Sequence, residues 1–430
     1  MLRVPTRDDG SGECARRHFF AERRPVDQDL HAVGTRGPGG TAQMTATQLA
    51  ADGPIRVRLV ESPLEMAALS ASWEALQAGA VITSVFETFD WQHLWWQSYG
   101  RGHALRVMVA TAGDAVVGIL PVYVHTVSML RYPVRLLRFV GTGGDTSPDD
   151  LGPILAVGGE VEAARALAEA VLRLPGWDVL LLADMNPSCP FTSAIAAVAR
   201  DAQLRTLTGR SERIAYVDLA PTWDAYTQAL SSHRRKRIRY IRKNFGRGQP
   251  TRFFVWDDPA TLEKGFDSLV RLHHKRWNRI GQRHAFSSPE YLAFHRAVMD
   301  ACLARDRLRL YCLELSGQIV AAQYCYKFRN AVYVMQTGFD PDFSDAGQVL
   351  LSHMVEHAIG EGHKVLDFLR GDHAYKEHFA ASERETMFVT AFRQTPGAWV
   401  YRTRRMYLPA IKARLLKALR HVRPAEPTST

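Results

Sequence analysis

Two stretches of this 430-residue chain share one alternation of apolar and polar residues, and this repeat restricts the fold most. Residues 105–125 and residues 308–328 each read as two strands around a tight turn. At one constant offset Leu105 aligns with Leu308, and the whole hairpins match. Two amphipathic hairpins can match by chance, but each of these follows an aromatic-bearing helix and precedes a strand, a helix and a strand. The pattern therefore predicts an internal duplication.

The rest of the chain alternates strand and helix patterns, so we expect a mixed α/β fold with two related domains, 53–212 and 213–398. Besides its hairpin, the first half predicts a strand at 55–60, helices at 63–78 and 89–99, a helix at 160–173, a strand at 178–183 and a helix at 189–201. The second half predicts a strand at 214–219, a basic helix at 231–248, a strand at 251–256, helices at 260–278 and 289–304, and a strand, helix and strand between 331 and 367.

Both ends of the chain differ from these halves. Residues 1–52 are rich in Arg, Gly, Asp and Thr without a sustained apolar period, so they are predicted to be disordered. Residues 399–430 are predicted to form a basic, partly amphipathic helix and tail. Packing of that helix on the second half and reversible contact with a membrane surface both fit its pattern.

Cysteine usage and hydropathy predict a cytoplasmic protein. The five cysteines are scattered without a Cys-x-x-Cys pair or an even framework, which is typical of a reducing compartment. The sequence lacks a run of about 18 apolar residues that could span a bilayer, and it lacks the apolar core of a signal peptide. The net charge of +10 favours anionic partners, including phosphorylated cofactors, lipid head groups and nucleic acid, without choosing among them.

Several enzyme classes lack their motifs here. The sequence has no GxSxG elbow, no GxxxxGK[ST] loop and no GxGxxG after a strand, which disfavours serine hydrolases, P-loop nucleotidases and dinucleotide oxidoreductases. His363, His373 and His378 lack the spacing of HExxH and no Cys lies nearby, so no metal is expected.

A helix that starts near Gly347 is the first candidate for a binding site. Ser344, Asp345 and Ala346 precede this glycine and provide an N-cap followed by small residues. The unpaired N–H groups of a first helical turn can bind a phosphate, and glycine lets the phosphate approach the backbone. Most helix starts of this kind bind nothing, so the pattern alone leaves both interpretations open.

A second candidate lies where the strand after that helix opens into a polar loop. Asp367, Arg370, Tyr375 and Lys376 follow there, and ligands of α/β sheets favour the carboxyl ends of strands. An Asp–Arg pair that only fixes the loop explains these residues equally well. Separately, the basic helix at 231–248 has apolar residues along one face. Its other face can contact nucleic acid, anionic lipid or cofactor phosphates, or stay solvated.

Taken together, these residues resemble the bacterial double-GNAT acetyltransferases, a FemAB-like group often described as associated with cellulose biosynthesis. The resemblance runs from about residue 57 to residue 393. It rests on the paired hairpins and, in order, on FETFDWQHLWWQSYGRG (86–102), LSSHRRKRIRY (230–240), LHHKRW (272–277), TGFDPDFSDAGQVLL (337–351) and DFLRGDHAYK (367–376). It implies a tandem GNAT fold whose second copy binds acetyl-CoA or another acyl-CoA and transfers the acyl group to an amine.

The resemblance also implies where acyl-CoA binds, namely a strand backbone for the pantetheine arm and a turn for the pyrophosphate. The residues expected in these two places are Ala321, Ala322, Gln323, Ser344, Ala346, Gly347 and Gln348. The turn departs from the family pattern Gln/Arg-x-x-Gly-x-Gly/Ala, because Ser344 replaces the first residue and Val349 the last. Asp345 adds a negative charge that would repel a pyrophosphate unless it points away.

Direct acyl transfer needs a base for the amine, donors for the oxyanion and an acid for the leaving thiolate. From their crowding and the resemblance, we give Asp367 the base or amine-orienting role and Tyr375 the acid role. Arg370 and Lys376 are expected to bind the acceptor. The acceptor itself, whether amino sugar, lipid-linked saccharide, peptide amine or small metabolite, stays open, as does peripheral contact with the inner face of the membrane.

Two other functions fit the same residues. Fem-type enzymes use aminoacyl-tRNA on the same tandem fold, and the basic helix would suit tRNA phosphates. The long helical arm that several of them insert is missing here. Alternatively, a non-catalytic GNAT pair attached to envelope-polysaccharide assembly would explain the altered turn.

Overall fold

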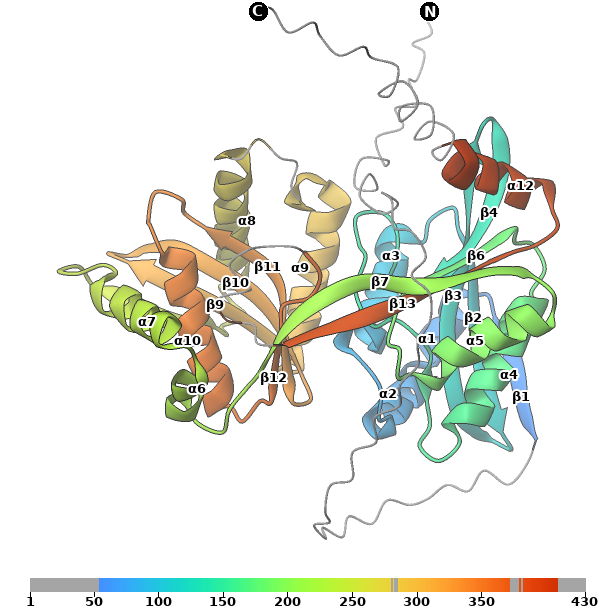
Figure 1. Cartoon of the computed structure of the whole chain (residues 1–430), viewed down its shortest axis with the longest axis horizontal. Coiled ribbons are helices and arrows are strands. Elements are labelled where there is room, and N and C mark those ends of the chain that lie inside the picture. Colours follow the sequence, from blue (N-terminus) through green and yellow to red (C-terminus); the bar gives the residue numbers. More distant parts are fainter. Residues whose placement is uncertain (1–53, 280, 282–284, 372–378, 380–381, 409–430) are drawn as a thin grey trace, which may run out of the picture. The chain divides into compact units, whose positions relative to one another are not determined.

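The computed structural model describes residues 54–408 apart from 280, 282–284, 372–378 and 380–381 (Figure 1). All described residues belong to one compact unit. The predictions for residues 1–52, for Tyr375 and Lys376, and for the tail from residue 409 onward lie outside the described residues. Within the described part of the chain, no helix is long and apolar enough to cross a membrane.

One mixed sheet connects the described strands in the order β1-β2-β3-β4-β6-β13-β7-β12-β11-β10-β9-β8, with β5 paired to β3. The strands are β1 (Ile55–Val60), β2 (Ala104–Ala112), β3 (Ala115–Met129), β4 (Tyr132–Phe139), β5 (Ile154–Leu155), β6 (Val179–Met185), β7 (Arg205–Asp218), β8 (Thr251–Trp256), β9 (Leu308–Leu315), β10 (Gln318–Phe328), β11 (Ala331–Phe339), β12 (Val365–Asp367) and β13 (Ser382–Phe392). The alternating patterns at 55–60, 178–183 and 251–256 all form strands, as predicted.

Helices pack on the sheet at the positions that the apolar periods predict, except at Trp223–Ala229, where no helix was predicted. They are α1 (Pro63–Ala68), α2 (Ser70–Gly79), α3 (Phe89–Tyr99), α4 (Glu160–Arg173), α5 (Pro190–Asp201), α6 (Trp223–Ala229), α7 (Ser232–Asn244), α8 (Leu262–Arg279), α9 (Pro289–Ala304), α10 (Ala346–Gly360) and α12 (Pro396–Arg402). One expected helix, 63–78, is divided at Leu69, which ends α1 and precedes α2.

The two hairpins confirm the predicted duplication down to single residues. Leu105 pairs with Tyr123 in the first hairpin, and the aligned Leu308 pairs with Tyr326 in the second. Each hairpin also contains one irregularity in its register, and it falls at the same aligned position in both. Because a β-bulge is a specific local feature, its repetition indicates that the halves are copies of one unit.

Two long strands are common to both halves. In Figure 1, β7 and β13 run side by side between them. The last strand of the chain, β13, lies between β6 and β7 and pairs with both antiparallel. β7 begins beside the end of β13 and finishes beside β12. The predicted boundary between residues 212 and 213 lies within β7, and the division into two domains stays a prediction.

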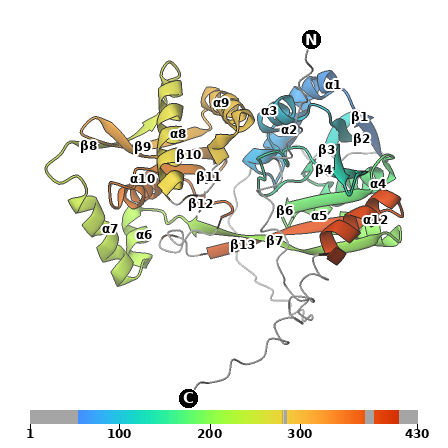
Figure 2. The ribbon, with the colours of Figure 1, turned by 90° about the horizontal axis from the view of Figure 1, so that it is seen from above.

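Much of the core is also common to both halves. One cluster of buried apolar side chains contains residues of both, and Trp91 of α3 belongs to it. The Trp91 ring lies 4.9 Å from the ring of Phe294 in α9 and 5.8 Å from that of Tyr326 in β10, measured between centroids. A second cluster packs β10 and β11 against α10 and α7 (Figure 2). The sheet is thus covered on both faces in the second half.

Candidate functional site

β11 and β12 separate after a short parallel contact. They pair only from Ala331 and Val365 to Tyr333 and Asp367. β11 continues to Phe339 and stays paired with β10 on its other side. Within the described residues, the edge of β11 beyond Tyr333 therefore has no strand beside it. Backbone groups on such an edge can pair with an extended ligand.

The turn after β11 leads into α10 without a side-chain cap. Asp345, its N-cap residue, has a left-handed backbone with φ of 69°. Among the described residues, the amides of Gly347 and Gln348 have no hydrogen-bond acceptor. Gly347 lies against the ring of Phe339, where an added Cβ would be 3.1 Å from Cδ1. The absence of a side chain at Gly347 thus keeps the first turn of α10 accessible beside a tightly packed ring.

The acidic residues of this turn are all paired with cations. Asp345 forms an ion pair with Arg237 of α7. Lys275 of α8 lies 2.7 Å from carboxylate oxygens of both Asp340 and Asp342. The charge of Asp345, which would repel a phosphate, is therefore balanced, and its carboxylate is directed to α7. Arg279 of α8 also lies 3.1 Å from Asp342. Because three cations of α7 and α8 face the three carboxylates of the turn, an anion can approach the amides of α10.

The other residues expected to hold acyl-CoA lie in β10. Ala321, Ala322 and Gln323 are fully buried and paired with β9 on one side and β11 on the other. The structure does not bring them to the open edge, because β11 stands between. The segment that leads to the turn is β11 itself, and its signal was available in the sequence, because it directly precedes the turn.

Asp367 ends β12 and is enclosed by hydrogen bonds. Its Oδ1 accepts from the backbone amide of Leu369 at 2.7 Å, and its Oδ2 from Arg384 Nε at 2.9 Å. The same guanidinium contacts Asp150 at 2.7 Å, so one arginine joins two carboxylates. Burial raises the pKa of Asp367, while the neighbouring Arg384 opposes the rise. An Asp–Arg pair, the alternative to a role in the site, is thus present at Asp367, and its arginine is Arg384.

Arg370 is held by the first half of the chain. Its Nη2 lies 2.7 Å from Asp149 Oδ1 and 2.7 Å from Asp184 Oδ2. The Arg370 amide also donates to Asp149, and Nη1 donates to Ser147. The guanidinium is thus committed to a loop of the first half. Tyr375 and Lys376, the other residues expected beside it, lie outside the described residues.

A pocket of about 260 Å³ opens between the two halves, next to Asp367. The polar residues in its lining are Glu87, Asp150, Asn186, Tyr216, Asn330, Tyr333, Asp367 and Arg384. Burial raises the pKa of Glu87 to about 8, and the nearby Asp150 adds to the rise. Burial also raises the pKa of Asp150 to about 7 against the effect of Arg384. Two carboxyl groups therefore titrate near neutral pH in one pocket.

Sequence reasoning missed Glu87, Asp150 and Arg384. Glu87 carries a local signal, because Ser84 and Glu87 form a capping box in which the Ser84 amide donates to Glu87 Oε2 at 2.9 Å. That signal marks a helix start and says nothing of a pocket. Asp150 and Arg384 are 234 positions apart in the chain, so only the fold brings them together.

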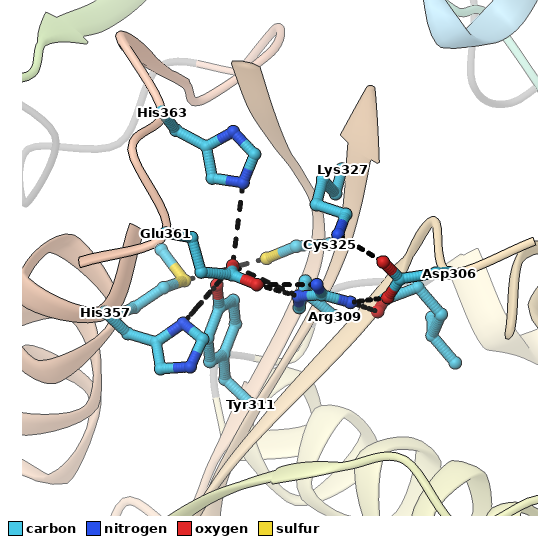
Figure 3. Close-up of polar contacts among 10 residues, drawn as sticks. Asp306, Arg309, Tyr311, Cys325, Lys327, His357, Glu361 and His363 are labelled. Carbon is cyan, nitrogen blue, oxygen red and sulfur yellow. Dashed lines mark hydrogen bonds and ion pairs between the residues drawn. The ribbon is translucent and has the colours of Figure 1, made fainter. Parts of the chain in front are cut away.

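The far end of α10 is fixed by a polar cluster (Figure 3). Glu361 caps the helix, and its Oε1 lies 2.6 Å from Nη2 of Arg309 in β9. Arg309 also contacts Asp306, which pairs with Lys327 of β10. This cluster ties the carboxyl end of α10 to the sheet, so the position of its amino end is constrained as well.

Residues 232–377 match the protein family described as acetyltransferase (GNAT) domain. This segment contains β11, the turn, α10 and β12. Residues 232–377 are therefore similar in sequence to a GNAT acetyltransferase domain. The match thus covers both the turn with its unpaired amides and the strand end at Asp367. Among the described residues, no group of three His, Cys, Asp or Glu side chains is arranged to hold a metal ion.

Solved structures resemble the chain over most of its length. The crystal structure of FemX gives a TM-score of 0.54 at 11% identity, covering 78% of this chain and 96% of FemX. L-PGS from Bacillus licheniformis gives 0.47 at 11% identity, over 83% and 98%. The tandem GNAT protein from the clavulanic acid biosynthesis pathway gives 0.41 at 12% identity, over 79% and 100%. No curated protein matches the chain in sequence. The likeness to FemX confirms the predicted tandem fold.

Proposed function

We propose that this GNAT protein transfers an acyl group from an acyl-CoA, tested first with acetyl-CoA, to an amine acceptor. The observation that carries the proposal is the turn into α10, where every acidic side chain is paired and the amides of Gly347 and Gln348 have no acceptor among the described residues. Such amides suit a pyrophosphate. The open edge of β11 beyond Tyr333 suits the amides of an extended pantetheine arm.

The proposed reaction is a direct transfer. The acceptor amine gives up one proton, its nitrogen bonds to the carbonyl carbon, the carbon–sulfur bond breaks, and the departing thiolate takes up a proton. Both oxygens of Asp367 already accept hydrogen bonds, which favours the amine-orienting role over that of a base. Tyr375 keeps the proposed acid role and Lys376 the proposed role in acceptor binding. Arg370 serves the acceptor site by holding the loop of Asp149.

The proposal is tested by titrating the full chain with acetyl-CoA and CoA in a calorimeter and by following thiol release with a panel of amines. We expect binding of both donors and amine-dependent release. Asp367→Asn and Tyr375→Phe should each lower kcat by about a hundredfold, the usual size of a lost acid, base or orienting group. Absence of binding by either donor would overturn the acyl-CoA proposal.

An aminoacyl-tRNA donor is the second candidate, and the exposed face of α7 is the observation in its favour. Lys236, Arg239 and Lys243 are exposed there, whereas Arg237 and Arg242 pair with Asp345 and Glu356. Free basic side chains along one helix suit a nucleic-acid backbone. Activity that is lost after RNase treatment of the donor would favour this candidate, and activity with purified acetyl-CoA would exclude it.

The proposed donor also bears on the compartment. Acyl-CoA is used in the cytoplasm, and the described cysteines, Cys189, Cys302, Cys312 and Cys325, are all buried free thiols. Free thiols suit a reducing environment. A cytoplasmic location, with the basic C-terminal segment available for contact with the inner face of the membrane, is therefore part of the proposal.

A further inference from the structure

The pocket between the halves has an excess of acidic groups. Asp150 and Asp367 share the single guanidinium of Arg384, so when ionised this trio carries one net negative charge. Glu87 adds a third carboxyl group to the same lining. The three acids and one arginine leave the pocket short of positive charge by up to two units. An anion entering it would be repelled, and a cation would be attracted.

Glu87 has no cation of its own. Its side chain is buried, and among the described residues no lysine, arginine or histidine lies within 4.0 Å of its carboxylate. Oε2 accepts from the amide of Ser84, while Oε1 is next to Gly152, another residue of the lining. The closest positive influence is Arg329, whose guanidinium donates to the carbonyl oxygen of Gln77 at 2.8 Å. Thr83 also hydrogen-bonds to the Glu87 carboxyl group. The ionised form of Glu87 thus has hydrogen-bond partners but no ion-pair partner, so a cationic ligand would stabilise that form.

The pocket adjoins the place where the strands separate. Tyr333 and Asp367 line the pocket, and they are also the last residues that β11 and β12 pair before the open edge begins. A group held in the pocket therefore lies beside the edge to which we assign the acyl donor. This juxtaposition fits the acceptor better than any other ligand, because two substrates of a direct transfer must meet.

We infer that this pocket binds the alkylammonium group of the acceptor, with Glu87 and Asp150 of the first half as its recognition residues. The inference rests on the proposed function and names the acceptor class: an amine that arrives as a cation rather than a neutral or acidic molecule. The first half of the chain thereby selects the substrate for the second.

Proton release on binding is a direct consequence. With pKa values of about 8 and about 7, Glu87 and Asp150 are partly protonated at pH 7. An ammonium ion stabilises their ionised forms and expels protons into the buffer. The groups that face Glu87 are Thr83, Asp150, Arg329, the thiol of Cys189 and the phenol of Tyr333, and those that face Asp150 are Arg384, Asp367 and Asp149. Burial keeps the pKa of that thiol at about 12 and raises the pKa of Tyr333, so neither competes near neutrality.

The test is calorimetry on the full chain at pH 7 with three probes of similar length: 1,4-diaminobutane, 1,4-butanediol and succinate. Each titration is run in phosphate and in Tris, whose different ionisation enthalpies report protons released. We expect the diamine to bind at least about tenfold more tightly than the diol, with proton release, and succinate not to bind. Equal binding of diamine and diol, or tighter binding of succinate, would overturn the inference.

Two variants and one control assign the effect to the pocket. Glu87→Gln keeps an acceptor for the Ser84 amide, and Asp150→Asn suits the positive φ of 57° at that position. Each should weaken the diamine by about tenfold, and Glu87→Gln should abolish most of the proton release. Glu65→Gln, an exposed carboxylate of α1, should change neither quantity.

Titration of the same variants with CoA separates this inference from the proposed function. If CoA binds the wild type and the variants equally while the diamine effect is absent, the acceptor inference fails and the acyl-CoA proposal stands. If CoA binds none of them while the diamine behaves as expected, the donor proposal fails and the cation pocket stands.

Discussion

The two halves start from the same hairpin and differ where the next strands meet. In the second half, β11 runs on from Val334 to Phe339 after leaving β12. In the first half, β4 pairs with β6 over Leu136 to Arg138 and ends at Phe139. Within the described residues, the first half therefore has no open strand edge at the corresponding place. We call the second copy open, because the edge of β11 has no strand beside it there, and the first copy closed, because it lacks such an edge at the corresponding place among the described residues.

The loop after β4 shows how the first copy is closed. Gly143 and Thr146 exchange two backbone hydrogen bonds of 3.0 Å. Trp95 Nε1 donates to Thr146 Oγ1 at 2.7 Å, and the Tyr123 hydroxyl donates to the carbonyl oxygen of Thr142 at 2.6 Å. Polar groups that could receive a ligand are thus used inside the loop. Tyr123 aligns with Tyr326 of the second copy. The hydrogen bond from Tyr123 that fixes the loop thus comes from a position at which both copies have a tyrosine.

The end of that loop faces the second copy. Asp149 contacts Arg370, and Asp150 contacts Arg384. The end of the loop in the first half thus forms part of the wall of the pocket between the halves. A duplicated unit can divide labour in this way, with one copy holding the donor and the other presenting groups to the acceptor.

Two glycine substitutions, one in each half, test the proposed difference between the copies most directly. Gly347→Glu places a negative charge at the start of α10. An acidic side chain there is compatible with the helix, but it would repel a bound pyrophosphate. We expect CoA affinity to fall by about a hundredfold or more, with the free energy of unfolding changed by less than about 1 kcal/mol. Calorimetry and urea unfolding measure the two quantities.

Gly143→Ala is the matched change in the closed loop. Gly143 has φ of +116°, and an added Cβ would lie 2.7 Å from the Tyr123 hydroxyl oxygen. The substitution should lower the free energy of unfolding by about 1–3 kcal/mol and leave the CoA affinity of the folded protein unchanged. Loss of CoA binding in folded Gly143→Ala would show that the first half takes part in donor binding, and the division of labour would be wrong.

The two halves should also differ in the pH dependence that they give to stability, because their buried groups include a histidine in one half and a carboxyl group in the other. His295 of α9 lies 5.9 Å from Trp91 of α3 between ring centroids, and burial lowers its pKa to about 3. Below pH 6.5 the unfolded chain binds a proton that the folded chain does not, so stability falls as pH falls toward 3. Glu87, with its pKa raised to about 8, acts in the opposite sense, and its stabilisation is lost as pH rises from 4.5 through 8.

Where a group is protonated in only one of the two states, folded or unfolded, the free energy of unfolding changes by about 1.4 kcal/mol per pH unit. We call the range governed by His295 the acid limb of this curve. Urea unfolding from pH 4 to pH 9 should show His295→Leu with a flatter acid limb and Glu87→Gln with a flatter limb between pH 5 and 8. Leucine also removes two ring nitrogens that lack hydrogen-bond partners among the described residues. If both variants kept the wild-type slopes, burial of these groups would not be the cause.

The sequence predicted those structural features of the two halves that are encoded in local patterns. The hairpins, the open turn at Gly347 and the helix after it all follow from alternation, helical period and small residues. β13 was not predicted, because its place between β6 and β7 depends on partners far away in the chain. The orientation of Asp345 toward Arg237 was equally beyond reach, since the sequence shows the charge but not its direction.

The pocket illustrates the same limit more strongly. Asp367 was singled out because it stands at a strand end, but its partner Arg384 lies on a strand that the sequence did not predict. In the sequence, Glu87 is recognisable only as part of a capping box at a helix start. The cavity that it lines forms only where the two halves meet. Sites made within one copy can be read from sequence, whereas sites made between copies need the fold.

Two arginines that the duplication aligns, Arg106 and Arg309, form ion pairs that should contribute different, small amounts to the free energy of unfolding. Arg309 has a side chain only 12% exposed and contacts Glu361 at 2.6 Å within the cluster of Figure 3. Arg106 contacts Glu61 at the same distance, but Glu61 is 57% exposed. Glu361→Gln should therefore lower the free energy of unfolding by about 1–2 kcal/mol, and Glu61→Gln by less than about 0.5 kcal/mol. Equal losses in urea unfolding would mean that the cluster at the end of α10 gives the second copy no extra rigidity, and that the open turn is held by the sheet alone.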